Sequence, residues 1–288
     1  MKTEKTVDIR DIQKVELEIL KSFKDICEEF NLTYYLSGGT FIGAVRHQGF
    51  IPWDDDVDVA MPRKDYNEFL KVAQEKLPNK YQLIHYTKGE GVIHHMIKIE
   101  NSTYQLMDCT ASIPRTVNVW IDIFPLDGLP NNYLLKQIHC FKLLALRALF
   151  KYSLFDTIVD CRIEDRPWYE KILFLIGTKI KFDKILDPYR RMKAIDKCLS
   201  RYDFYESKYI MNFMGSYKFK SIMDREKIYA EGAKYSFEGI DFNAPKNYDL
   251  YLTQIYGDYM KLPPESQRNK HQTVILSIDR EENLDGEK

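Results

Sequence analysis

Glycine and proline are scarce in this chain of 288 residues, at 13 and 11. Because collagen-like and low-complexity disordered chains are rich in both, those classes are excluded. The net charge is also close to zero, at −1, since 42 Lys and Arg residues stand against 43 Asp and Glu residues. A general nucleic-acid binder carries an excess of basic residues, so we expect no nucleic-acid partner. The apolar fraction of 44% is sufficient for a large hydrophobic core.

Cysteines are few, odd in number and scattered, without a CxxC pair, at Cys27, Cys109, Cys140, Cys161 and Cys198. They form neither a disulfide framework nor a zinc motif, and they favour a reducing compartment. No apolar run approaches the roughly 18–20 residues of a membrane span. The charged segment 1–5 leads into no apolar stretch of a secretory signal. We therefore expect a cytoplasmic protein, with at most a peripheral contact at the inner face of the cell membrane.

The pattern of apolar residues predicts three segments along the chain. The first, 1–132, reads as a core of helices and strands, and 133–205 reads as a basic helical insertion. The third, 206–288, returns to short strands and turns and ends in a charged tail. Helices are predicted at 11–30, 41–47, 62–77 and 246–256. Strands are predicted at 33–36, toward the end of 54–61, and at 81–85, 93–100, 117–124 and 235–242.

Ser37, Gly38, Gly39 and Thr40 form a polar turn between a predicted strand and a predicted helix. Glycine lets backbone N–H groups approach an anion closely, and the N-terminus of the helix adds a favourable dipole. The turn is therefore a candidate phosphate-binding site. An ordinary strand-to-helix turn is the alternative.

Acidic residues follow within the segment 54–61. In an extended strand, residues two apart share a face, so Asp56 and Asp58 point the same way. Asp54 joins them if the strand reaches back far enough. Neighbouring carboxylates repel one another unless a divalent cation lies between them. The alternative is a solvated acidic turn.

Asp122 lies on the polar face of the predicted strand 117–124, whose other face is formed by Val117, Val119, Ile121 and Ile123. Carboxylates from two strands beside a glycine turn are a typical site for Mg²⁺, or Mn²⁺, that bridges nucleotide phosphates. Asp122 is also our candidate for the base that takes a proton from the hydroxyl group of an acceptor substrate.

Several motifs together resemble the LicD family. The longest is YLSGGTFIGAVRHQGFIPWDDDVDV at 35–59, and it is followed by Lys98 within MIKI at 96–99. Further matches are IDIFPLDG at 121–128 and YGDYMKLPP at 256–264. The resemblance spans about 32–271, with a divergent middle in the helical insertion.

The resemblance implies an α+β fold, a nucleotidyltransferase-like mixed sheet with a helical insertion. It implies transfer of phosphocholine from CDP-choline to a sugar hydroxyl of a cell-surface polysaccharide: a teichoic acid, lipopolysaccharide or capsule precursor, with the acceptor carried on a lipid. Another CDP-alcohol, carrying ribitol or glycerol phosphate, is an alternative donor. A non-catalytic scaffold that binds a nucleotide or a metal is the alternative outside the enzymes.

Other residues in or near the motifs are weaker candidates. Arg46, Lys98 and His271 are candidate phosphate ligands, with surface charge as the alternative. Aromatic faces attract quaternary ammonium groups, which makes Trp53, Tyr256 and Tyr259 candidates for contacting choline or the base. Most of the 20 tyrosines are nevertheless expected in the core.

The segment 133–155 combines many apolar residues with the cations Lys136, Lys142, Arg147 and Lys151 and contains no acid. This composition is typical of an amphipathic helix on an anionic lipid surface. A helix buried in a bundle, with a basic solvent face, is the alternative.

Overall fold

The computed structural model describes residues 8–89, 95–108, 115–154, 186–265 and 268. His271 and most of the middle of the predicted insertion, 155–185, lie outside the described residues, so those predictions stay untested.

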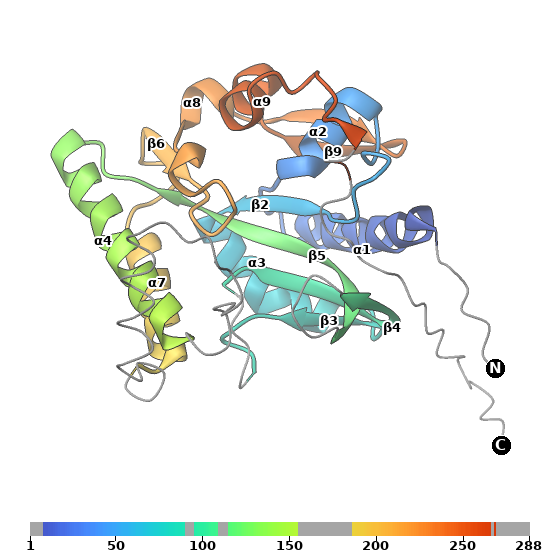
Figure 1. Cartoon of the computed structure of the whole chain (residues 1–288), viewed down its shortest axis with the longest axis horizontal. Helices are drawn as coiled ribbons and strands as arrows, with labels where there is room; N and C mark the ends of the chain where they lie inside the picture. Colours follow the sequence, from blue (N-terminus) through green and yellow to red (C-terminus); the bar gives the residue numbers. More distant parts are fainter. Residues whose placement is uncertain (1–7, 90–94, 109–114, 155–185, 266–267, 269–288) are drawn as a thin grey trace.

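A mixed sheet forms the centre of the fold (Figure 1). The strands follow the order β1 (Tyr35–Leu36), β2 (Asp58–Pro62), β5 (Arg115–Gly128), β4 (Ile97–Asp108) and β3 (Tyr81–Ile84). At the end of β5, β6 (Tyr209–Met211) pairs with it, and β7 (Met223–Asp224) pairs with β6. Among these described pairs, β2 and β5 are parallel and the others are antiparallel. The sheet and its helices confirm the predicted α+β class.

Helices lie on both sides of this sheet (Figure 1). On one side, α1 (Ile9–Glu29) and α3 (Arg63–Lys76) pack against each other and against β5. On the other side lie α2 (Gly38–His47), the short α8 (Arg225–Ile228) and α9 (Tyr248–Tyr256). The hairpin of β8 (Ala233–Phe237) and β9 (Ile240–Ala244) packs beside α2 and β1.

A helical pair stands at one end of the molecule, formed by α4 (Tyr133–Ser153) and α7 (Pro188–Leu199) (Figure 1). A buried arginine connects this pair to the sheet. Arg63 donates to both carboxylate oxygens of Asp127 on β5, at 2.6 and 2.9 Å, and to Asp196 on α7 at 2.8 Å. The buried charges are thus paired, as burial requires. The boundaries of the insertion, 133 and 205, stay a prediction.

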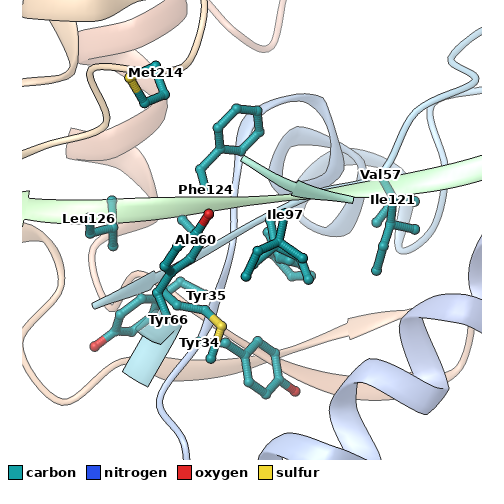
Figure 2. Packing of buried hydrophobic residues seen from close by; sticks show 14 of the residues in the cluster. Tyr34, Tyr35, Val57, Ala60, Tyr66, Ile97, Ile121, Phe124, Leu126 and Met214 are labelled. Atoms are coloured by element: carbon teal, nitrogen blue, oxygen red, sulfur yellow. The ribbon is translucent and has the colours of Figure 1, made fainter. Parts of the chain in front are cut away.

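Alternation along β5 separates the core from the functional side of the sheet. Ile121 and Ile123 are fully buried, and together with Ile97 they face α1. Phe124, one residue on, points to the opposite side, toward Met214, as Figure 2 shows. Since side chains two apart share a face, Asp122 lies on the same side as Phe124.

Two element boundaries differ from the predictions. The second helix begins at Gly38 rather than at Phe41, because Gly38 takes a positive φ of 57° that turns the chain directly from Ser37 into the helix. The strand predicted toward the end of 54–61, with Asp56 in it, begins only at Asp58, so Asp56 lies before it. The chain turns just before it, where the Asp54 N–H donates to Ile51 O at 3.0 Å.

Candidate active site

A cavity of about 210 Å³ opens beside the start of β2 and the middle of β5. Its polar wall from the N-terminal half consists of Ser37, Gly38, Asp56, Asp58 and Asp122. The opposite wall comes from the C-terminal third of the chain and includes Asn212, Tyr217, Tyr229 and Tyr251. The structure thus brings the three predicted carboxylates and half of the predicted glycine turn to one cavity.

The parallel pairing of β2 with β5 fixes the relative positions of two carboxylates. Asp58 and Asp122 are direct register partners on β2 and β5. The Asp122 N–H donates to Val57 O at 2.9 Å, and the Asp58 N–H donates to Thr40 Oγ1 at 2.8 Å. Thr40 therefore positions Asp58 through its backbone and is buried beneath the site rather than lining it.

Both glycines of the turn pack against carboxylates. A Cβ on Gly38 would clash with Asp58 Oδ2, and one on Gly39 would clash with Asp54 Oδ2. Glycine is required here for space, and at Gly38 also for its backbone conformation. The turn and the acidic residues therefore form one unit.

Tyr251 on α9 forms hydrogen bonds with the first residue of α2 and with the residue before it. Its hydroxyl lies 3.0 Å from Ser37 Oγ and accepts from the Gly38 N–H at 3.3 Å. Ser37 occupies the N-cap position of α2, but its side chain makes no capping hydrogen bond there. The N-terminus of a ten-residue helix thus meets the cavity with a serine and a tyrosine hydroxyl at its entrance.

Burial and mutual repulsion raise the pKa values of the carboxyl groups around the cavity. Burial first, and then Asp56, Asp122 and Asp54, raise the pKa of Asp58 well above its ordinary value. The pKa of Asp54 rises to about 8, because of burial, the charges of Asp56 and Asp55, and a hydrogen bond with Asp56. In the absence of a cation the cluster binds protons instead.

Lys98 is the cation nearest to Asp122 in the described structure. The two are opposite each other on β4 and β5, with Lys98 Nζ 3.5 Å from Asp122 Oδ1. Trp120 Nε1 donates to Asp122 Oδ2 at 3.3 Å, and Lys98 Nζ lies 4.0 Å from the centre of a Trp120 ring. Burial raises the pKa of Asp122, while Lys98 and Trp120 lower it.

α1 contributes two buried polar residues that sequence reasoning missed. Gln13 Nε2 donates to Asp54 O at 2.9 Å and to Ile51 O at 3.2 Å, so it fixes the turn before the acidic residues. Glu16 is fully buried beside them, and burial followed by the charges of Asp56, Asp55 and Asp54 raises its pKa well above the ordinary value. On sequence alone both resemble the polar face of an amphipathic helix.

The donor set fits a hard divalent cation. Asp56, Asp58 and Asp122 offer carboxylate oxygens to one cavity, and such oxygens are the ligands that Mg²⁺ and Mn²⁺ prefer. Within the described ranges, no three His, Cys, Asp or Glu side chains are placed so that they could hold a metal ion as they stand, so these carboxylates would have to move toward a bound ion. Asp54 lies behind Gly39 and does not line the cavity.

Other predicted site residues lie away from the cavity lining. Arg46 donates to Tyr259 O at 2.7 Å and to His47 Nε2 at 2.9 Å. The guanidinium of Arg268 lies over Trp53, with Arg268 Cζ 4.6 Å from the centre of a Trp53 ring. The Tyr259 hydroxyl donates to Asp249 at 2.9 Å. These residues join the motif at 256–264 to α2 and the turn after it.

Tyr256 reaches the cavity indirectly, because its ring packs 5.3 Å from that of Tyr217, which does line it. Tyr217 and Tyr251 are functional-site residues that the sequence analysis missed. Tyr251 lies just before the motif at 256–264, but Tyr217 is far from it in the sequence, and 20 tyrosines gave no means to select either.

Comparison with known proteins agrees with this architecture. A family model described as "LicD/FKTN/FKRP, nucleotidyltransferase domain" matches residues 31–137, which carry β1 to β5 and the acidic residues. The match shows that residues 31–137 are similar to a nucleotidyltransferase domain.

Relatives extend the match over nearly the whole chain. The lipopolysaccharide cholinephosphotransferase LicD of Haemophilus influenzae is 34% identical over 279 residues, which cover 93% of this chain and 97% of the relative. Two uncharacterized proteins match shorter stretches. The one from Rickettsia typhi is 32% identical over 68 residues, 24% of this chain and 22% of its own. The one from Caenorhabditis elegans is 41% identical over 54 residues, 19% of this chain and 14% of its own. The chain belongs to the LicD family.

Proposed function

We propose that this LicD family member is a transferase that moves phosphocholine from CDP-choline to a sugar hydroxyl of a cell-surface glycan carried on a lipid. The observation that carries the proposal is the gathering of Asp56, Asp58 and Asp122 in one cavity beside Ser37 and Gly38. It is supported by 34% identity, over 93% of the chain, to a lipopolysaccharide cholinephosphotransferase.

Asp56, Asp58 and Asp122 would hold Mg²⁺ or Mn²⁺. When bound, the ion supplies positive charge that neutralises the donor phosphates and offsets the repulsion among the carboxylates. The protein's part is to fix the oxygens of Asp58 and Asp122 through the pairing of β2 with β5. Positioning and charge neutralisation are the main contributions that a phosphodiester transfer requires.

The start of α2 would bind the donor phosphates. Helix N-termini attract anions through free N–H groups and the helix dipole. The Ser37 hydroxyl lies at the cavity and can turn from Tyr251 to a phosphate oxygen. Gly38 and Gly39 keep this end of the helix close to Asp58 and Asp54, so phosphate and carboxylates meet without an intervening side chain.

The acceptor hydroxyl oxygen would attack the phosphorus that bears choline. A new P–O bond forms to the sugar, the P–O bond to CMP breaks, and CMP leaves with the electron pair of that bond. Asp122 is the proposed acceptor of the hydroxyl proton. Burial makes its carboxylate more basic, while Lys98 and Trp120 favour its ionised form, which a base requires.

The aromatic wall of the cavity offers a contact for the quaternary ammonium of choline. We assign this contact to Tyr217, whose ring lines the cavity and is held by Tyr256. Cation–π attraction contributes roughly 0.5–2 kcal/mol per ring. The Tyr217→Leu variant is expected to raise KM for CDP-choline and leave KM for CDP-glycerol unchanged, whereas Tyr217→Phe retains the ring and the affinity. Tyr256→Phe is the matched control.

One experiment tests the function itself. Purified protein and Mg²⁺ are incubated with CDP-choline, CDP-ribitol or CDP-glycerol, with and without a lipid-linked glycan, and CMP release is followed. We expect release that depends on the glycan and is fastest with CDP-choline. Faster release from CDP-ribitol or CDP-glycerol would identify the alternative donor. Binding of CDP-choline without any release would identify a non-catalytic scaffold.

A further inference from the structure

α4 presents an apolar face that the rest of the described structure leaves exposed. Phe141 is 74% exposed, Leu134 66% and Ile138 56%. The same helix exposes four more large apolar side chains, Tyr133, Leu135, Leu144 and Leu149. Single exposed apolar residues are ordinary on protein surfaces, but a contiguous set marks an interaction site. Within the described structure, this exposure favours the surface helix over a helix that is buried in a bundle and has a basic solvent face.

The geometry of the helix arranges these residues as a stripe with basic edges. Successive residues lie about 100° apart around a helix, so Leu134, Ile138 and Phe141 fall within an arc of about 60°. Lys142 and Lys151, both exposed, lie about 80–100° from Phe141 on opposite sides of it. An apolar stripe with a cation on each side is the pattern of a helix that lies in a membrane interface.

Charge indicates which partner contacts the exposed face of α4, a lipid surface or a second copy of the chain. The segment 133–155 contains no Asp or Glu. If two copies paired through this face, Lys142 and Lys151 of both would approach one another with no acid on the helix to pair with them. An anionic bilayer offers the complementary charge, and each cation near it contributes about 1 kcal/mol.

The opposite face of α4 contacts the rim of the cavity. The Phe150 ring packs 4.7 Å from that of His95, whose neighbour Met96 lines the cavity. Arg147 lies over the Phe213 ring at 5.6 Å and donates to Phe213 O at 3.5 Å, between the lining residues Asn212 and Met214. Figure 1 shows the helix at the edge of the molecule, projecting beyond the sheet.

We propose that α4 docks on an anionic bilayer, with Leu134, Ile138 and Phe141 inserted at the interface and Lys142 and Lys151 on lipid phosphates. Docking would bring the cavity to the membrane surface, where a lipid-carried acceptor is found. This purpose rests on the proposed function, but the docking itself does not. None of the described helices is long and apolar enough to cross a membrane, so docking through α4 is parallel to the surface.

Flotation with vesicles tests the docking. The full chain is mixed, without donor or acceptor, with vesicles of phosphatidylglycerol and phosphatidylcholine or of phosphatidylcholine alone. We expect flotation with the anionic vesicles only, weakened when salt is raised from about 0.05 to about 0.5 M, which shortens the Debye length severalfold. A wild-type protein that does not float with anionic vesicles at low salt overturns the proposal.

Two variants localise the contact to the stripe and its edges. The triple variant Leu134→Gln, Ile138→Gln, Phe141→Gln is expected to lower the vesicle partition coefficient at least about tenfold, a change of 1.4 kcal/mol. Lys142→Gln with Lys151→Gln is expected to remove the preference for anionic lipid. The matched controls are Leu250→Gln, an exposed leucine on α9, and Lys14→Gln with Lys71→Gln, exposed lysines on α1 and α3. The controls are expected to float like the wild type.

Folding and self-association are measured on the same samples. Far-UV circular dichroism melts verify that the variants are folded, as substitutions of exposed side chains should be. If the folded triple variant floats like the wild type, the stripe is not the contact and the proposal fails. It fails equally if sedimentation velocity finds a dimer that the triple variant abolishes and no vesicle binding. CMP release from CDP-choline in detergent tests the proposed function separately.

Discussion

Asp58 and Asp122 are direct register partners on the parallel strands β2 and β5. Register partners on neighbouring strands point to the same face of a sheet, so the backbone itself holds two carboxylates side by side. No rotation of either side chain removes them from the same environment. The pairing costs stability in the metal-free protein, and we propose that it positions oxygen ligands for a divalent cation.

Replacing one of these carboxylates by a neutral amide should therefore lower the catalytic rate without lowering the stability of the metal-free protein. For Asp56→Asn or Asp58→Asn we expect loss of transfer by more than tenfold, a barrier increase above about 1.4 kcal/mol. The free energy of unfolding of the metal-free protein should rise slightly, because repulsion is relieved. Asp55→Asn is the matched control, since Asp55 is in the same acidic run but does not line the cavity. Substantial activity in the Asp58 variant would contradict the proposed role of this carboxylate.

Activity should also depend on a divalent cation. We expect EDTA to abolish CMP release and Mg²⁺ or Mn²⁺ to restore it, because carboxylate and phosphate oxygens bind hard cations. A readout without turnover is the midpoint of thermal unfolding, which Mg²⁺ should raise in the wild type and raise less in Asp58→Asn. Full activity in the presence of chelator would exclude the proposed ion.

The acidic cluster should make the metal-free protein less stable as pH rises. Burial and neighbouring charges raise the pKa of Asp54 to about 8 and raise those of Asp58 and Glu16 well above their ordinary values. The folded state then binds more protons than the unfolded state, so the free energy of unfolding falls with pH until the folded pKa is passed. His85, with its pKa lowered to about 4, gives the opposite slope, but only up to its unfolded value of about 6.5.

The window from about pH 7 to about pH 8.5 therefore reports on the carboxyl groups, whose unfolded pKa values lie near 4. The charged groups that act on Glu16 are Asp54, Asp55, Asp56 and Asp122. Those that act on Asp58 are Asp54, Asp56, Asp122 and Lys98. We expect thermal unfolding midpoints to fall across this window in EDTA, and the fall to be smaller in Glu16→Gln. Saturating Mg²⁺ should flatten the profile. Midpoints that are constant or rise with pH in EDTA would contradict this assignment.

Local patterns predicted much of the fold. The three- and four-residue spacing in the first helix and the alternation around Asp122 are short-range signals, and α1 and β5 confirm them. The boundaries at Gly38 and Asp58 were missed for two different reasons. Residue propensity does not distinguish a glycine that precedes a helix from one that begins it, and the turn before Asp58 depends on a backbone hydrogen bond and on Gln13 from another helix.

Long-range contacts determined the parts of the site that the sequence did not reveal. Tyr251 meets Ser37 across 214 positions of the chain, so no motif in either neighbourhood contains the pair. Glu16 was missed because an acidic residue on an amphipathic helix ordinarily faces water, and only the packed structure buries it. Asp56, Asp58 and Asp122 were found because strand alternation and mutual repulsion are visible in the sequence.

The last prediction concerns the space that Gly38 leaves for Asp58. Gly38 and Gly239 both have positive φ values, 57° and 75°, so alanine at either position costs about 1–2 kcal/mol of backbone strain. Only at Gly38 does the added Cβ meet a carboxylate, whereas at Gly239 it meets open space. We therefore expect both Gly38→Ala and Gly239→Ala to lower the unfolding midpoint, and only Gly38→Ala to weaken Mg²⁺ binding, measured by titration calorimetry without substrate. Equal Mg²⁺ affinity in the two folded variants would show that the position of Asp58 does not depend on Gly38.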